Sequence, residues 1–116
     1  MAWSVEFYAD RRGHAPVEAF FETLETGDLA RIQRDLELLE EFGISLRAPH
    51  VKHLEGKIWE LRTKSRGQNF RVLYFTYVGK RIVLLHALLK KTPRIPRDDL
   101  ALAEKRLWDF LDQERR

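Results

Sequence analysis

The sequence predicts an α+β protein in which residues 1–116 form a single domain, and three patterns support this fold class. Apolar and polar residues alternate near the N-terminus, two segments with helical spacing follow, and four short β-rich runs then lead into a third helical segment. The expected order is β-α-α-β-β-β-α: an antiparallel sheet core with an N-terminal α-hairpin and a C-terminal helix, and with the helices on one face of the sheet. With 116 residues and 44% hydrophobic content, the chain is long enough to bury one core.

The alternation near the N-terminus has the period of two expected of a half-buried strand, which should end near Asp10. Pro16 suits the first position of a helix, and Gly27 is expected to end that helix. Asp28 should then cap a second helix that closes at Gly43. Apolar residues recur at every third or fourth position of this second segment, so the two helices should form a hairpin.

The second half of the chain is rich in residues that favour strands. The β-rich runs cover residues 51–54, 57–62, 69–77 and 81–89, with glycine-containing turn signals between them. This spacing indicates an antiparallel meander. Pro96 is well placed to start the last helix, because Asp98 and Asp99 then lie in its first turn.

The charges are distributed unevenly along the chain. Residues 47–97 contain thirteen Lys and Arg against two acids, Glu55 and Glu60, so this segment carries +11 although the whole chain carries +3. Clustered cations bind polyanions because counterions are released from the phosphates. The segment therefore predicts a nucleic-acid partner, although a merely solvated basic face is the simpler alternative.

Several protein classes are disfavoured by composition. The chain has no cysteine, so it has neither disulfides nor thiolate metal ligands, and its four histidines lack the spacing of a metal site. The N-terminus lacks the layout of a signal peptide, and the longest apolar runs are too short to span a bilayer. We expect a soluble cytoplasmic protein with no membrane association.

Three motifs carry a resemblance to a known family. They are KHLEGKIWELR at residues 52–62, FRVLYF at residues 70–75 and LHALLKKTP at residues 85–93. Together they resemble the RelE/HigB toxin superfamily, and most closely the phage-derived HigB-like branch of type II toxin–antitoxin toxins.

The resemblance implies a ribosome-dependent mRNA endoribonuclease that is inhibited by a cognate antitoxin, often of the helix-turn-helix type. Its partners would be mRNA and the rRNA of the ribosome. In this reaction the ribose 2′-hydroxyl attacks the adjacent phosphate, so that neither a metal nor another cofactor is required.

Five residues are candidates for the chemistry. Arg71 interrupts an apolar run and matches the family's phosphate-stabilising arginine, although it is alternatively a solvated arginine at the sheet surface. Glu60 and Arg62 share a strand face, and they converge with Arg71 if the turn sets Glu60 opposite it; Glu60 is then either a general base or part of an ion pair. Lys91, with Lys90, matches the family's basic pair, although an ordinary solvated strand end is the alternative. His86 is either an acid–base group or a core histidine that shares a face with its even-spaced neighbours.

An outer set of cations is expected to hold the RNA backbone without taking part in the reaction. This set consists of Lys52, Lys57, Lys64, Arg66, Lys80, Arg81 and Lys90. Trp59 and Tyr74 are more simply explained as packing residues than as platforms for stacked bases.

One departure from the family pattern concerns the general acid. Several relatives carry a Tyr or His near the chain end, whereas no Tyr or His follows Lys91 here. Either His86 takes that role, or the acid is dispensable, or the activity is weak. Charge and fold also leave two alternatives to the enzyme open: a non-catalytic module that binds RNA or the antitoxin, and a structural phage protein, which leaves the +11 segment unexplained.

Overall fold

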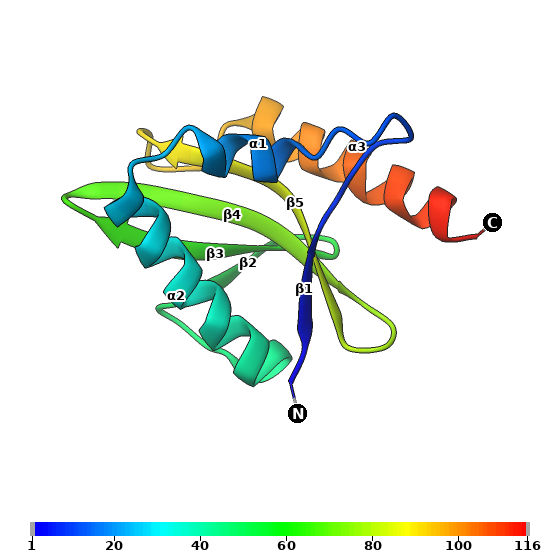
Figure 1. Ribbon diagram of the computed structural model, residues 1–116, viewed down its shortest axis with the longest axis horizontal. Coiled ribbons are helices and arrows are strands. Elements are labelled where there is room, and N and C mark those ends of the chain that lie inside the picture. Colours follow the sequence, from blue (N-terminus) through cyan, green and yellow to red (C-terminus); the bar gives the residue numbers. More distant parts are fainter. Residues whose placement is uncertain (1, 116) are drawn as a thin grey trace.

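The computed structural model describes residues 2–115, whose five strands form one sheet (Figure 1). In chain order the elements are β1 (Ser4–Phe7), α1 (Pro16–Glu22), α2 (Thr26–Phe42), the 3-10 turn η1 (Gly43–Ser45), β2 (Val51–Glu55), β3 (Ile58–Ser65), β4 (Gln68–Tyr77), β5 (Arg81–Lys90) and α3 (Arg97–Glu114). The strand order is β1-β5-β4-β3-β2, with β1 parallel to β5 and all other neighbours antiparallel. The α+β class is confirmed. The expected order counted one strand too few, since four strands follow α2, and β1 ends before Asp10.

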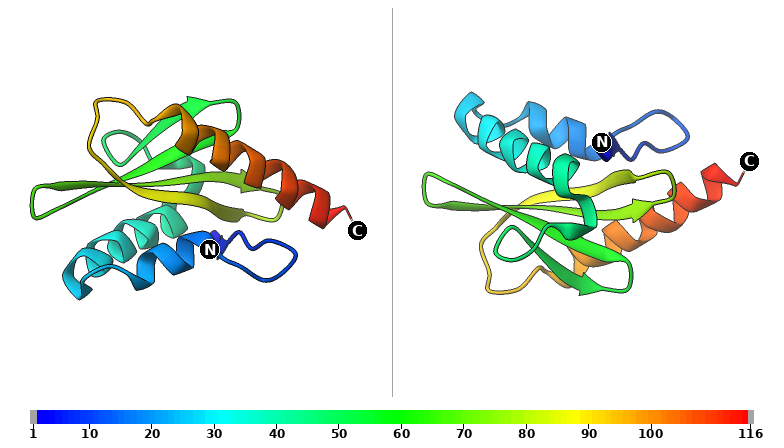
Figure 2. Two further views of the ribbon diagram at one scale, coloured as in Figure 1. Left: turned by 90° about the horizontal axis from the view of Figure 1, so that it is seen from above. Right: turned by 90° about the horizontal axis from the view of Figure 1, so that it is seen from below.

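The helices cover both faces of the sheet, so the expected packing on one face is wrong. Figure 2 shows α1 and α2 on one side of the sheet and α3 on the other. The reason lies in β5, whose residues 82–85 are fully buried in an unbroken apolar run and therefore need cover on both sides. The core on the hairpin side includes Val17, Ile32, Leu39, Leu61, Val72 and Leu84, and the core on the α3 side includes Leu73, Phe75, Val83, Leu85, Leu107 and Phe110.

The junction between α1 and α2 also differs from the expectation. Gly27 lies inside the first turn of α2 and does not end α1, and the N-cap of α2 is Glu25. Asp28 is buried in that first turn, where its carboxylate accepts hydrogen bonds from the hydroxyl of Ser65 and the guanidinium of Arg66. A long-range tie to the β3–β4 turn has thus taken the place of the predicted cap.

A bulge in β5 changes which face its side chains occupy. Tyr74 pairs with Leu84, but the next residue back, Leu73, pairs with His86, so Leu85 is an extra residue in the ladder. Leu84 therefore packs on the hairpin side, and both Leu85 and His86 lie on the α3 side. Strict alternation would place His86 on the same face as Leu84, but the bulge places the two side chains on opposite faces.

Among residues 2–115, no helix combines the length and the apolar character needed to cross a membrane.

Candidate nucleic-acid interface

The α3 side of the sheet carries a patch of polar side chains in cross-strand register. Side chains on this side alternate along each strand, so the pairing places them in rows. Three rows result: Lys52–Glu60–Leu73–His86, Arg62–Arg71–Leu88 and Lys64–Asn69–Lys90. The N–H of Arg62 donates to the carbonyl of His50, which extends the second row by one residue. The two arginines are thus direct neighbours, with Glu60 one row away.

Glu60 lies between the two arginines and forms an ion pair with each. Its Oε2 is 3.2 Å from Nε of Arg62, and its Oε1 is 3.4 Å from Nε of Arg71. The side chains of Glu60 and Arg71 are only 3% and 9% exposed, and that of Arg62 is 34% exposed. The register pairs Arg62, rather than Glu60, directly with Arg71, but all three converge on one face as the sequence suggested.

This buried cluster has unused hydrogen-bonding capacity. Glu60 Oε1, Arg62 Nε and Arg71 Nε are buried without a hydrogen-bond partner, because their ion-pair contacts lack hydrogen-bonding geometry. The Arg71 guanidinium donates to the Phe70 carbonyl, and burial lowers its pKa below the ordinary arginine value, an effect that Glu60 opposes. Two arginines against one carboxylate leave a net charge of +1 for an anion to neutralise.

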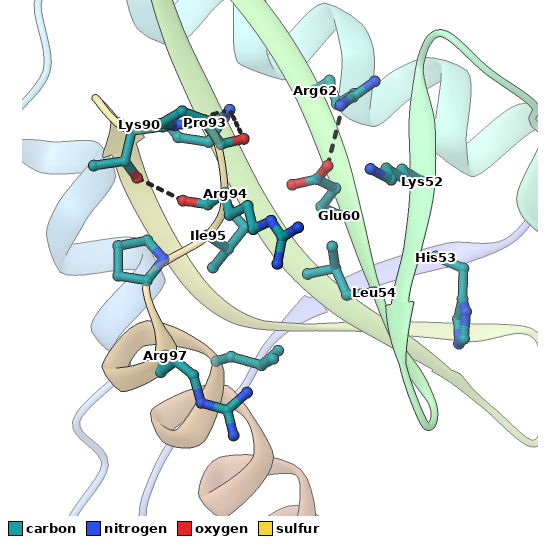
Figure 3. A pocket seen from close by; sticks show the side chains of 13 residues that line it. Lys52, His53, Leu54, Glu60, Arg62, Lys90, Pro93, Arg94, Ile95 and Arg97 are labelled. Carbon is teal, nitrogen blue, oxygen red and sulfur yellow. Dashed lines mark hydrogen bonds and ion pairs between the residues drawn. The ribbon is translucent and has the colours of Figure 1, made fainter.

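A groove of about 850 Å³ opens beside this cluster (Figure 3). Strands β2 and β3 form one wall, with Lys52, Glu60 and Arg62, and residues 92–96 together with Arg97, the first residue of α3, form the other. Figure 3 shows the Arg94 side chain extending from the loop toward the strands. The lining cations are Lys52, Arg62, Lys90, Arg94 and Arg97, with Glu60 as the one lining carboxylate among the described residues.

Lys90 holds the loop that forms one wall of the groove, and it also adds a positive charge to the groove. Its Nζ donates hydrogen bonds to the carbonyls of Thr92 and Pro93, each at 3.1 Å. The hydroxyl of Thr92 donates to the carbonyl of Arg94, which tightens the same turn. Lys91 is exposed immediately after β5 and does not line the groove.

A second hollow of about 420 Å³ lies on the other side of Arg62. It lies at the edge of β3 that extends past Val51, the first residue of β2, and therefore has no β2 partner. It is lined by Asp35, Pro49, His50, Arg62, Thr63, Lys64, Asn69 and Arg71. The groove and this second hollow share Arg62, so the side chain of Arg62 stands between them.

His86 lies apart from these two spaces, under α3. Its Nε2 is 2.6 Å from Oδ1 of Asp99, and its Nδ1 is 3.0 Å from Nη1 of Arg106, which also donates to the Leu85 carbonyl. Because a guanidinium only donates, Nδ1 must accept, and Nε2 then carries the ring proton and donates a hydrogen bond to Asp99. Both ring nitrogens are therefore occupied by partners on α3.

Two cations of the proposed outer set are held in ion pairs away from the groove. Arg66 pairs with Asp28 and Glu25, and hydrogen bonding to Asp28 raises its pKa. Arg81 pairs with Glu6 and Glu114, which likewise raise its pKa.

The remaining outer cations are spread along the sheet. Lys52 and Lys90 line the groove, and Lys64 lines the second hollow. Lys57 lies in the β2–β3 turn. Lys80 lies in the β4–β5 turn, directly before Arg81, the first residue of β5. Arg71 and Tyr77, the partner of Arg81, are six positions apart on β4, or roughly 20 Å of strand. The structure thus gathers only part of the outer set around the groove.

Trp59 and Tyr74 face the hairpin side of the sheet, where they pack with the core. Burial raises the pKa of the Tyr74 hydroxyl above the ordinary tyrosine value. The packing interpretation of these two aromatic residues is confirmed.

Arg94, Arg97 and His50 line these spaces but were not singled out in the sequence. The two arginines belong to the thirteen cations counted in residues 47–97, so the charge asymmetry was a signal for them. His50 gave no such signal, because only the backbone pairing of residue 50 with Arg62 brings it to the cluster.

The arrangement is suited to binding phosphate groups along a strip of sheet. Guanidinium groups bind phosphate oxygens in a fork, and lysines add point charges. Within residues 2–115, no group of three or more His, Cys, Asp or Glu lies in a metal-binding arrangement. A reaction without metal stays a prediction.

The fold and the groove define a class, namely a small α+β protein with a basic groove over a five-stranded sheet. The family model described as phage-derived protein Gp49-like (DUF891) matches residues 19–108, so the chain belongs to this family. The family is phage-derived and linked to the toxins of toxin–antitoxin systems, among the RelE/HigB-like toxins. No curated protein matches the chain.

Proposed function

We propose that this chain is the toxin of a type II toxin–antitoxin system, on a RelE-like fold of the HigB-like branch. It acts in the cytoplasm as a ribosome-dependent endoribonuclease on mRNA, without a metal or another cofactor. The family membership supports the class, and the Arg62–Glu60–Arg71 cluster beside the groove is the observation that carries the activity.

The reaction places the largest demand on charge stabilisation. As the ribose 2′-oxygen bonds to phosphorus, the bond to the 5′-oxygen breaks and negative charge accumulates on the phosphoryl oxygens. Preformed cations aimed at those oxygens stabilise this state more than the ground state. Arg71 and Arg62 are held in place by Glu60 before any RNA binds, so little reorganisation is needed.

The roles follow from this geometry. Arg71 and Arg62 bind the phosphate that is cleaved, and Glu60 fixes their orientation and balances part of their charge. Lys52, Lys90, Arg94 and Arg97 hold the neighbouring backbone in the groove, and Lys64 and Lys91 extend the positive surface.

The test is induction of the wild type and of Arg71→Lys in a bacterial host, with primer extension on a reporter mRNA. Lysine keeps the charge but loses the fork of donors, so we expect cleavage to fall by about 10²-fold or more, as for removal of one transition-state donor. Arg81→Lys is the matched control. Arg81 lies at the end of β5 that is far from the groove, and it forms ion pairs with Glu6 and Glu114. This variant should cleave like the wild type. Normal growth and no new 5′ ends with the wild type would contradict the endoribonuclease.

A non-catalytic module that binds RNA or the antitoxin is the second candidate, and the small exposed fraction of Arg71 favours it, since a covered guanidinium has limited access to substrate. It predicts ribosome binding by the wild type without cleavage. In either case the partner is a cognate antitoxin, which we propose to be of the helix-turn-helix type.

A further inference from the structure

We propose that His50 is the proton acceptor of this site and removes the proton from the ribose 2′-hydroxyl. The inference rests on the proposed endoribonuclease activity and adds a catalytic residue to it. The sequence had left proton transfer to Glu60 or His86, and His50 was not among the candidates.

The position of His50 is fixed by the sheet. Its carbonyl accepts the N–H of Arg62, and its own N–H donates to the carbonyl of Arg47, so the backbone is held on both sides of the residue. Residue 50 is two positions before Lys52 and shares its side of the sheet, in the row of Arg62 and Arg71. The His50 side chain lines the second hollow together with both arginines.

His50 is also the histidine with both ring nitrogens available. Within residues 2–115, His14 pairs with Asp10, Nε2 of His53 is bonded to the Gly56 carbonyl, and both nitrogens of His86 are occupied. The half-buried His50 ring has no hydrogen bond or ion pair at either nitrogen. A general base needs a free lone pair within reach of the proton that it removes.

The alternative base, Glu60, is poorly placed for this task. Both of its oxygens face arginines, and its side chain is 3% exposed, so taking up a proton would break two ion pairs. The shared position of Arg62 between the groove and the second hollow suits a phosphate held at Arg62 and Arg71 with its attacking ribose in the hollow.

The step balances as follows. The neutral imidazole of His50 takes the 2′-hydroxyl proton as the 2′-oxygen bonds to phosphorus. The bond from phosphorus to the 5′-oxygen breaks, and its electron pair leaves with the 5′-oxygen, which takes a proton from water. The imidazolium then returns its proton to the hydroxide. The products are a 2′,3′-cyclic phosphate and a 5′-hydroxyl end.

Four charged groups among the described residues line the second hollow with the His50 ring. Arg62 and Lys64 on β3 and Arg71 on β4 face the second hollow, with Asp35 of α2 at its other wall. Asp35 accepts a hydrogen bond from the Thr63 hydroxyl, so its carboxylate is already engaged.

The experiment measures single-turnover cleavage of mRNA on programmed ribosomes by the purified full chain, at several pH values between 5 and 8. For the wild type we expect the rate to rise with pH, because a general base acts only in its unprotonated form. We expect His50→Gln to cleave about 10²- to 10⁴-fold more slowly and to lose that rise. His14→Gln, at an exposed histidine outside the site, is the control and should keep both rate and profile.

A folding defect is distinguished by chemical rescue. His50→Ala should recover cleavage when imidazole is added, which a purely structural role does not predict, and thermal unfolding should show that it is folded. A wild-type rate and pH profile in His50→Gln would overturn the role of His50 and leave the proposed function standing. No cleavage by the wild type on programmed ribosomes would overturn both.

Discussion

Substitution of Glu60 by Gln tests whether the arginine cluster is held together by this one carboxylate. Glu60 is the counter-charge for two guanidinium groups whose residues are direct cross-strand neighbours. Glutamine keeps the size of the side chain and removes the charge, so Arg62 and Arg71 then repel each other without compensation. We expect the variant to be less stable and to bind anions more strongly.

The size of the loss follows from the contacts. One unit pair at 3.4 Å, the Arg71–Glu60 separation, attracts with about 5 kcal/mol at an effective dielectric constant of about 20. The variant no longer has the free-energy cost of burying a charged carboxylate, which offsets part of this loss. The contact of Glu60 with Arg62, which is 34% exposed, is screened by water and adds at most about 1 kcal/mol. Loss of one partner of a buried pair costs about 3–5 kcal/mol, and we expect about 3 kcal/mol here.

The assay is urea unfolding at pH 7 with and without inorganic phosphate. The variant cluster carries +2 instead of +1, so added phosphate should raise the unfolding midpoint of Glu60→Gln more than that of the wild type. Glu55→Gln, an exposed carboxylate at the end of β2, is the matched control and should change little. A Glu60→Gln variant as stable as the wild type, or one without a larger response to phosphate, would refute the reasoning.

Two further predictions concern Asp28, which lies away from the groove, and the two arginines in the residue 92–97 wall of the groove. Hydrogen bonds from Arg66 and Ser65 lower the pKa of Asp28, so its contribution to stability is present above the ordinary aspartate pKa of about 3.9 and is lost as the pH falls through the lowered value. Urea unfolding should therefore show Asp28→Asn to be less stable than the wild type at pH 7, with a gap that closes below about pH 3.9; a constant gap would contradict this. The Arg94→Ala, Arg97→Ala double variant should bind single-stranded RNA more weakly, and the slope of log K against log salt should fall by about 0.7 for each lost phosphate contact. An unchanged slope in filter binding would show that these two arginines do not touch the backbone.

The elements that local periodicity encodes were predictable from the sequence. The two helices of the hairpin, all four β-rich runs and the last helix are present, because their apolar spacing matches the periods of 3.6 and 2. Even the cover on both faces was encoded in the unbroken apolar run of β5, although it was interpreted as one-sided packing. The convergence of Glu60, Arg62 and Arg71 on one face followed from alternation along each strand.

What the sequence did not provide depends on distant partners. The ion pairs of Arg66 with Asp28 and of Arg81 with Glu6 join residues 38 and 75 positions apart, which no local pattern reveals. Both arginines therefore looked like free cations. The position of His50 depends on backbone pairing with Arg62 just before the first residue of β2, and the occupied nitrogens of His86 depend on partners in α3.

The extra residue in β5 marks a point at which the strand can become shorter without losing the groove. Deletion of Leu85 would remove the bulge and restore strict alternation, and the residues on either side of it, Lys90 included, would keep their present faces and partners. An added residue here would instead shift the register and turn one part of the strand to the opposite face. A relative whose sequence aligns here with a gap of one residue should therefore present the same wall to its ligand from a regular strand.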